Sequence, residues 1–141
     1  MAFDNYFKLE FDAKKINESF ARNTVAMFCA NLKPTISEVN DIKTAVSEAV
    51  TNCIVHGYEN KGGVIVLEVG IENNTVDIKV TDNGVGIADI DMAIQPFFTT
   101  KTEEEHSGMG FTLMDSFMNF LEVEKNKPSG IVVHMKKVIK G

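Results

Sequence analysis

The chain has 141 residues, 44% of them hydrophobic, and a formal net charge of -6 at pH 7. This length and composition are typical of one globular domain with a buried core, here spanning residues 1–141. The acidic balance argues against direct nucleic-acid binding, and no apolar run near 18 residues, signal peptide or lipidation motif is found, so we expect a soluble, cytoplasmic protein without membrane contact.

The first half of the chain predicts a strand, two helices and a hairpin. A strand over residues 6–11 precedes a helix from about 17 to 31, which Pro34 interrupts. Residues 35–38 have the pattern of a capping box at the start of a long helix, and Gly57 is placed to end that helix. Two β-rich runs, around residues 65–69 and 75–81, flank a turn at 72–74.

The second half predicts a short helical stretch near residues 90–94, a helix over 108–120, and strands over 121–125 and 131–138 joined by a turn at 126–130. Helices on one face of a mixed, mostly antiparallel sheet make a two-layer α/β sandwich, of the α+β class. Cys29 and Cys53 fall at apolar helical positions, which predicts buried free thiols.

The long helix carries Glu48, Asn52 and His56 at positions i, i+4 and i+8, so their side chains follow one stripe of the helix. Apolar residues such as Ile42 and Val46 mark the buried face of the same helix. Taken alone, such a polar stripe is better explained as a solvated helix surface. A stripe that ends beside a second polar motif can instead address one ligand.

The second motif is Asp82-Asn83-Gly84-Val85-Gly86, directly after the strand over 75–81. Glycines at alternate positions permit positive φ and close approach to a flat ligand, and the carboxylate before them can accept a hydrogen bond from an exocyclic amine such as that of adenine. Asp-Asn-Gly is also a common turn, and the motif alone leaves both explanations open.

A third motif, Ser107-Gly108-Met109-Gly110-Phe111, opens the helix expected over residues 108–120. Free backbone N–H groups and the positive end of a helix dipole suit phosphate oxygens. The sequence contains no GxxxxGK[ST], which excludes a P-loop.

Read in order, these motifs resemble the GHKL superfamily of ATPases and kinases, whose fold is the GHKL (Bergerat) type of α/β sandwich. The matching segments are Glu48-x-x-x-Asn52, Asp82-x-Gly84-x-Gly86, Phe97-Phe98-Thr99-Thr100-Lys101 and Ser107-Gly108-Met109-Gly110-Phe111. Within this superfamily, residues 17–22, 46–52, 56–60 and 97–101 resemble the small anti-sigma factors with serine-kinase activity of endospore-forming bacteria.

The resemblance implies ATP or ADP and Mg²⁺ as cofactors. It assigns Glu48 as the catalytic general base, Asn52 as the magnesium ligand and Asp82 as the adenine-reading carboxylate, with Gly84 and Gly86 shaping the pocket. Further nucleotide-binding residues are implied in a lid and in the phosphate-facing backbone: Thr99, Thr100, Lys101, Ser107, Gly108, Met109, Gly110 and Phe111.

Two positions depart from the pattern of the relatives. His106 stands where they usually have an arginine, which implies weaker or more pH-sensitive contact with the γ-phosphate. Ile131 follows Gly130 where they often have threonine, which implies that a water-mediated adenine contact is missing.

Arg22 is the only arginine among 14 basic residues and matches an arginine on the partner-binding face of these relatives. An ordinary helix-surface arginine is the alternative. The implied partners are a sporulation sigma factor, an anti-anti-sigma factor that accepts the phosphoryl group, and a second copy in a homodimer.

Two functions remain open at this point. The first is an anti-sigma factor that is also a serine protein kinase and inactivates its antagonist by phosphorylation. The second is a nucleotide-dependent sigma-binding module with little or no phosphotransfer.

Overall fold

The computed structural model describes residues 3–87 and 110–141. The strands are β1 (Asn5–Asp12), β2 (Val64–Glu72), β3 (Thr75–Thr81), β4 (Phe120–Lys125) and β5 (Ile131–Val138). The helices are α1 (Ile16–Phe28), α2 (Ile36–Asn52) and α4 (Gly110–Phe117), with a 3₁₀ turn at Ala30–Leu32 and a π-helical turn at Cys53–Gly57. The strands form one sheet in the order β1-β2-β3-β5-β4.

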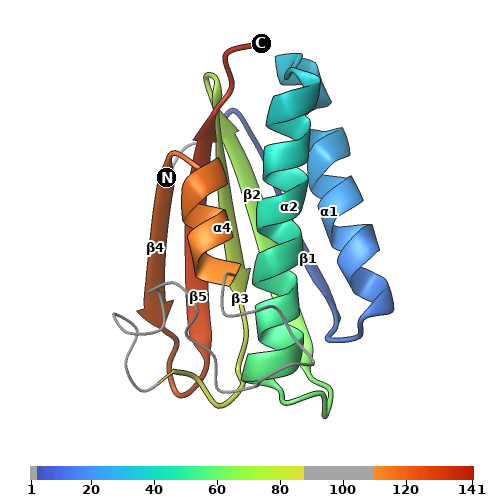
Figure 1. The fold of residues 1–141 in the computed structure, drawn as a ribbon, viewed down its shortest axis with the longest axis vertical. Helices are drawn as coiled ribbons and strands as arrows, with labels where there is room; N and C mark the ends of the chain where they lie inside the picture. The colour runs from blue at the N-terminus through green and yellow to red at the C-terminus, as the bar shows by residue number, and fades with distance from the viewer. Residues whose placement is uncertain (1–2, 88–109) are drawn as a thin grey trace.

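All pairings between the described strands are antiparallel, so the expected mixed sheet is antiparallel throughout this part of the chain. Helices α1, α2 and α4 cover one face of this sheet (Figure 1). The predicted two-layer α/β sandwich is therefore confirmed. Alternate residues of β2, β3 and β5 point into the layer beneath the helices, as the period of a half-buried strand requires: Ile65, Leu67, Val69, Val76, Ile78, Val80, Val133 and Met135 are buried.

Helix α2 starts at the predicted capping box. The Thr35 hydroxyl accepts the Glu38 N–H at 3.1 Å, and the Glu38 carboxylate accepts the Thr35 N–H at 2.9 Å. These reciprocal bonds satisfy two backbone donors that the first turn of a helix would otherwise leave open. Along the rest of the helix Ile42, Val46 and Ala49 are buried against the sheet.

The predicted helix over residues 108–120 is too long at its C-terminal end. Helix α4 ends at Phe117, and Phe120 is the first residue of β4, where it pairs with Lys136. The Asn119 N–H already donates to the Lys136 carbonyl at 2.8 Å. Sheet pairing therefore outweighs the helical period at these residues. The helical stretch expected near residues 90–94 lies outside the described residues.

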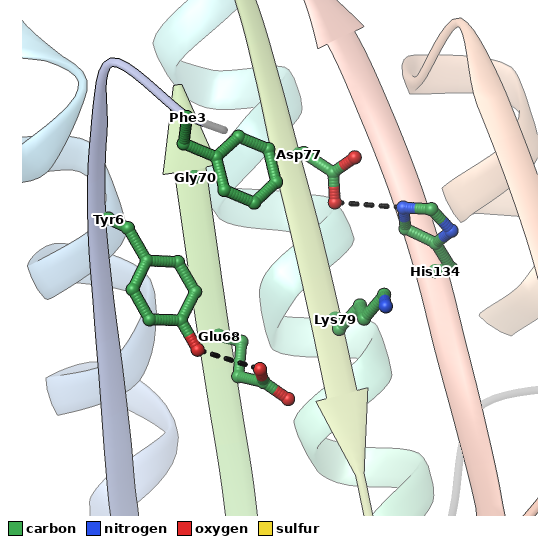
Figure 2. Close-up of a pocket in the computed structure, with 7 residues that line it drawn as sticks. All are labelled: Phe3, Tyr6, Glu68, Gly70, Asp77, Lys79 and His134. Atoms are coloured by element: carbon green, nitrogen blue, oxygen red, sulfur yellow. Dashed lines mark hydrogen bonds and ion pairs between the residues drawn. The ribbon is translucent and has the colours of Figure 1, made fainter. Parts of the chain in front are cut away.

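Because the three helices of the described part of the chain all lie on one face of the sheet (Figure 1), its second face carries none of them. Figure 2 shows residues of this second face. This face has a shallow hollow of about 520 Å³ lined by Phe3, Tyr6, Glu68, Gly70, Asp77, Lys79 and His134. The Phe3 ring lies over Gly70, where an added Cβ would come within 2.5 Å of the ring. Tyr6 and Phe120 are 46% and 39% exposed on this face, which leaves apolar surface open to a partner.

Both cysteines are free and buried, as predicted. Burial raises the pKa of the Cys29 thiol to about 12. Among the described residues, no helix is both long and apolar enough to cross a membrane.

Candidate nucleotide site

The C-terminal half of α2 and the first residue of α4 bring two of the predicted site residues together. A Cβ atom built on Gly110 would lie 3.4 Å from Glu48 Oε1 and 3.7 Å from both amide atoms of Asn52. Asn52 is 9% exposed, and its Nδ2 has no hydrogen-bond partner among the described residues. The side chains of Glu48 and Asn52, one helical turn apart on α2, thus meet at the N-terminus of α4, where even an added methyl group would be in ordinary van der Waals contact with both.

After Asn52 the backbone widens into the π-helical turn Cys53–Gly57, a feature that is frequent at functional sites. This turn places Gly57 against the Asp82 side chain. A Cβ on Gly57 would lie 3.1 Å from the carboxylate atoms of Asp82. The π-helical turn after α2 therefore packs against the loop that begins at Asp82.

Asp82 is 1% exposed at the end of β3. Its Oδ1 accepts the Gly84 N–H at 2.9 Å, whereas Oδ2 has no hydrogen-bond partner among the described residues. Burial raises the pKa of this carboxyl, and the bond from Gly84 partly opposes the rise. A buried carboxylate oxygen without a partner costs free energy, which a ligand that donates a hydrogen bond would recover.

The two glycines of the Asp82 loop have different roles. Gly86 has φ of +78°, the left-handed conformation that the sequence predicted. The expectation of a positive φ at Gly84 is wrong, because the structure has no positive φ there. Gly84 is needed for close approach instead, since an added Cβ would lie 2.1 Å from the Gly57 carbonyl oxygen.

Ile131 contacts this loop through its backbone. Its carbonyl accepts the Asp82 N–H at 3.1 Å, and its side chain is buried in the core. Ile131 thus supports Asp82 through its backbone, and it lacks the hydroxyl group that a threonine would have at this position.

Three residues that the sequence reasoning did not single out hold the loop at Asn83. The Tyr58 hydroxyl accepts the Asn83 N–H at 2.8 Å, Ser129 donates to its carbonyl at 3.0 Å, and Asn126 donates to its Oδ1 at 3.0 Å. In the sequence, Asn126 and Ser129 indicated only a turn. No local pattern linked them to a residue more than 40 positions earlier.

The structure does not describe most of the remaining predicted residues. Thr99, Thr100, Lys101, His106, Ser107, Gly108 and Met109 lie outside the described residues. The Phe111 side chain is buried in the core, so only its backbone is placed to face a ligand. Arg22 is on α1, which lies on the far side of α2 from α4 (Figure 1), and its guanidinium pairs with Glu18 at 2.7 Å. The structure does not bring Arg22 into the cluster around Asn52.

The donor set fits a magnesium ion that is carried by a nucleotide. Within the described part of the chain, no group of three or more His, Cys, Asp or Glu side chains could hold a metal ion. Mg²⁺ commonly keeps several waters and takes one or two protein ligands together with phosphate oxygens. A single amide oxygen from Asn52, beside the N-terminus of α4, is consistent with that mode of binding.

Residues 11–137 match the histidine kinase-like ATPase domain family. The chain therefore belongs to this class of ATP-binding domains. The fold agrees with two solved structures. One, of the RsbU and RsbW domains from Mycobacterium tuberculosis, has a TM-score of 0.67 at 16% identity and covers 96% of this chain and 32% of that longer chain. The other is the mycobacterial sensor histidine kinase MprB, with a TM-score of 0.60 at 14% identity over 94% of this chain and 98% of that one.

Curated relatives define the family more narrowly. An anti-sigma F factor from Thermoanaerobacter sp. (strain X514) is 56% identical over 99% of this chain and 97% of its own length. One from Clostridium kluyveri is 54% identical over 96% of both chains. The chain belongs to the family of anti-sigma F factors.

Proposed function

We propose that this protein is an ATP-dependent anti-sigma factor that binds a sporulation sigma factor and phosphorylates a serine of its anti-anti-sigma antagonist. The observation that carries the proposal is that Glu48 and Asn52, both on α2, converge at Gly110 of α4. The π-helical turn that follows α2 packs against the Asp82 side chain through Gly57. The names of the relatives supply the partner class. The proposal includes a cytoplasmic location, where a sigma factor and ATP are both available.

The buried Asp82 carboxylate is the proposed base-recognition group. Its Oδ2 has no hydrogen-bond partner among the described residues, so the exocyclic amine of adenine would complete its hydrogen bonding. A guanine base would present a carbonyl oxygen to the same carboxylate, which is repulsive. Selectivity for adenine over guanine therefore follows from the position of one atom, Asp82 Oδ2.

Phosphoryl transfer is assigned to the region between Glu48 and the N-terminus of α4. The serine oxygen of the antagonist attacks the γ-phosphorus, the bond from that phosphorus to the bridging oxygen of ADP breaks, and the serine proton passes to the Glu48 carboxylate. Such general-base assistance contributes about 10²–10⁴-fold. Mg²⁺, held by Asn52, would supply neutralisation of the phosphate charge, and positioning provides most of the remaining effect.

The lid and phosphate roles of Thr99, Thr100, Lys101, Ser107, Gly108 and Met109 are part of the same proposal and rest on the sequence alone. Gly110 and Phe111 contribute backbone at the start of α4. Their N–H groups belong to the first turn of the helix, where they have no partner within the helix and suit an anion.

Transfer of label from γ-labelled Mg-ATP into the proteins of a host lysate tests the kinase assignment, with wild type and Glu48→Gln compared side by side. We expect one small protein to be labelled by wild type alone, while both forms bind ATP with similar affinity. If both forms bind ATP and neither labels a protein, the protein is a nucleotide-dependent sigma-binding module. If wild type does not bind ATP, both functions are excluded.

We also propose a homodimer formed through the open face of the sheet. Tyr6 and Phe120 leave aromatic surface exposed there, and Phe3 covers only the part above Gly70 (Figure 2). Phe120→Glu would place a charge in such an interface, so we expect a monomer in sedimentation equilibrium. Met27→Glu, on the exposed side of α1, should leave the dimer intact.

A further inference from the structure

Asn83 follows Asp82, the proposed base-recognition residue, and both its backbone N–H and its carbonyl are hydrogen-bonded. The N–H of Asn83 donates to the Tyr58 hydroxyl at 2.8 Å, and its carbonyl accepts the Ser129 hydroxyl at 3.0 Å. Tyr58 in turn donates to the Val64 carbonyl at the start of β2. The loop is thus tied both to the end of the α2 region and to the turn between β4 and β5.

Asn126 adds two more bonds from the same turn. Its Nδ2 lies 3.0 Å from the Asp82 carbonyl oxygen and 3.0 Å from Asn83 Oδ1. Its own N–H closes the turn by donating to the Gly130 carbonyl at 2.9 Å. One side chain therefore contacts Asp82 and Asn83 together, from a turn that is fixed internally.

The turn also approaches the loop too closely for a side chain. A Cβ on Gly130 would lie 2.0 Å from the Asp82 carbonyl oxygen, and Gly130 has φ of +94°. The Asp82 backbone is therefore in contact with the turn on one side, while its carboxylate lies against Gly57 on the other. Among the described residues, the side chains of the turn donate hydrogen bonds to Asp82 and Asn83 and none to Asn52 or Gly110.

We infer that Asn126 and Ser129 are positioning residues for base selectivity: they hold the backbone of Asp82 and Asn83 so that the Asp82 carboxylate keeps the direction that an adenine amine requires. The inference rests on the proposed role of Asp82. Hydrogen bonds weaken steeply as their angles depart from linear, so a loop that tilts loses this bond first. A support that fixes the direction of a buried group raises affinity by preorganisation.

The test compares the affinity of the full chain for ATP and for inosine triphosphate, in which a carbonyl oxygen replaces the exocyclic amine. We expect Ser129→Ala and Asn126→Ala each to bind Mg-ATP about fivefold more weakly, the effect of losing about one hydrogen bond. Affinity for inosine triphosphate should be unchanged or slightly higher, because the repulsion from Asp82 is relaxed. The ratio of the two affinities is therefore the readout.

Two variants serve as controls. Ser129→Thr keeps the hydroxyl and should retain the selectivity of wild type, and Lys125→Ala changes an exposed residue of the same hairpin and should leave both affinities unchanged. Thermal denaturation of each variant shows whether the fold is retained.

Equal weakening for both nucleotides would mean that the turn supports the fold in general, and the inference would be wrong. Unchanged selectivity in both alanine variants would overturn it as well. The proposed function is judged separately by wild type and Asp82→Asn. If wild type discriminates and Asp82→Asn does not, the role of Asp82 stands whatever the turn variants show. If wild type does not discriminate, the role of Asp82 and this inference fail together.

Discussion

Gly57 and Gly84 approach so closely that a Cβ atom on Gly84 would lie 2.1 Å from the Gly57 carbonyl oxygen. The same carbonyl accepts the Val85 N–H at 2.8 Å. The end of the π-helical turn and the loop after β3 are thus joined backbone to backbone, with no side chain between them. This contact fixes the distance between the two walls of the proposed base pocket.

Gly84→Ala should therefore weaken nucleotide binding strongly. The added methyl group meets backbone and not the end of a flexible side chain, so the loop must move away from Gly57. We expect at least a tenfold loss of ATP affinity in a calorimetric titration. Val85→Ala, at a neighbouring position that is 66% exposed, is the matched control and should bind ATP as wild type does. Normal binding by Gly84→Ala would show that the close contact is not needed.

Asp82→Asn separates binding from stability. Because burial raises the pKa of this carboxyl, the ionised form is costly in the folded state, and the cost is present at pH values above the folded pKa. At neutral pH the asparagine variant should unfold at an equal or higher denaturant concentration, while its ATP affinity falls at least tenfold. A variant that loses both binding and stability would contradict this account, since Asp82 would then be mainly structural.

Local sequence patterns were sufficient for most of the fold. The capping box at Thr35 and Glu38 and the alternation in β2 and β3 act over a few residues, so they can be read directly. The end of α4 could not be read in this way. Phe120 continues an apolar helical pattern, and only pairing with Lys136, a residue of β5, places it in a strand.

For the candidate site, the sequence predicted which residues to consider. The order of the motifs placed Glu48, Asn52 and Asp82 in one family pattern, and the structure supplies the geometry that the pattern lacked. The support by Asn126 and Ser129 could not be predicted, because hydrogen bonds to Asn83 from a distant turn leave no periodic signal. The role of Gly84 was also missed, since a glycine required for close approach looks the same in a sequence as one required for positive φ.

Arg22→Ala tests the proposed partner surface. The Arg22 side chain is 31% exposed and its guanidinium pairs with Glu18 within α1, so the loss to helix stability should be small, about 0.5 kcal/mol. We expect sigma-factor affinity to fall at least tenfold in a binding titration, with ATP affinity unchanged. Arg22→Lys should give an intermediate loss because lysine lacks the planar fork. Lys14→Ala is the control for loss of one exposed positive charge, and an equal effect from both alanine variants would argue against a specific role.

Glu38 should make stability depend on pH in the acid range. The Lys140 N–H donates to its carboxylate at 2.7 Å, and this bond, together with the bond from the Thr35 N–H, lowers the pKa of Glu38. A lowered folded pKa gives stability that is complete above the unfolded value, about 4.3, and is lost as pH falls through the folded value. The difference in unfolding free energy between wild type and Glu38→Gln should thus shrink between pH 5 and pH 3. A difference that stays constant over that range would contradict the assignment.

Lys137 links the position of α4 to the rest of the fold. Its Nζ donates to the Phe117 carbonyl at 2.7 Å, in the last turn of α4, and pairs with Asp41 Oδ2 on α2 at 3.0 Å. The Lys137 side chain is 13% exposed, so both contacts are largely shielded from water. Lys137→Met should lower the free energy of unfolding by about 2 kcal/mol, since it removes hydrogen bonds from a charged group.

The same substitution should weaken ATP binding, because the opposite end of α4 begins at Gly110, directly over Glu48 and Asn52. An α4 helix released from Lys137 can tilt, and its first N–H groups then leave the proposed phosphate site. Denaturant unfolding and ATP titration of Lys137→Met measure the two effects together, with Lys140→Met as an exposed control. A loss of stability with unchanged ATP affinity would show that α4 keeps its place without Lys137, and the link between that lysine and the site would be refuted.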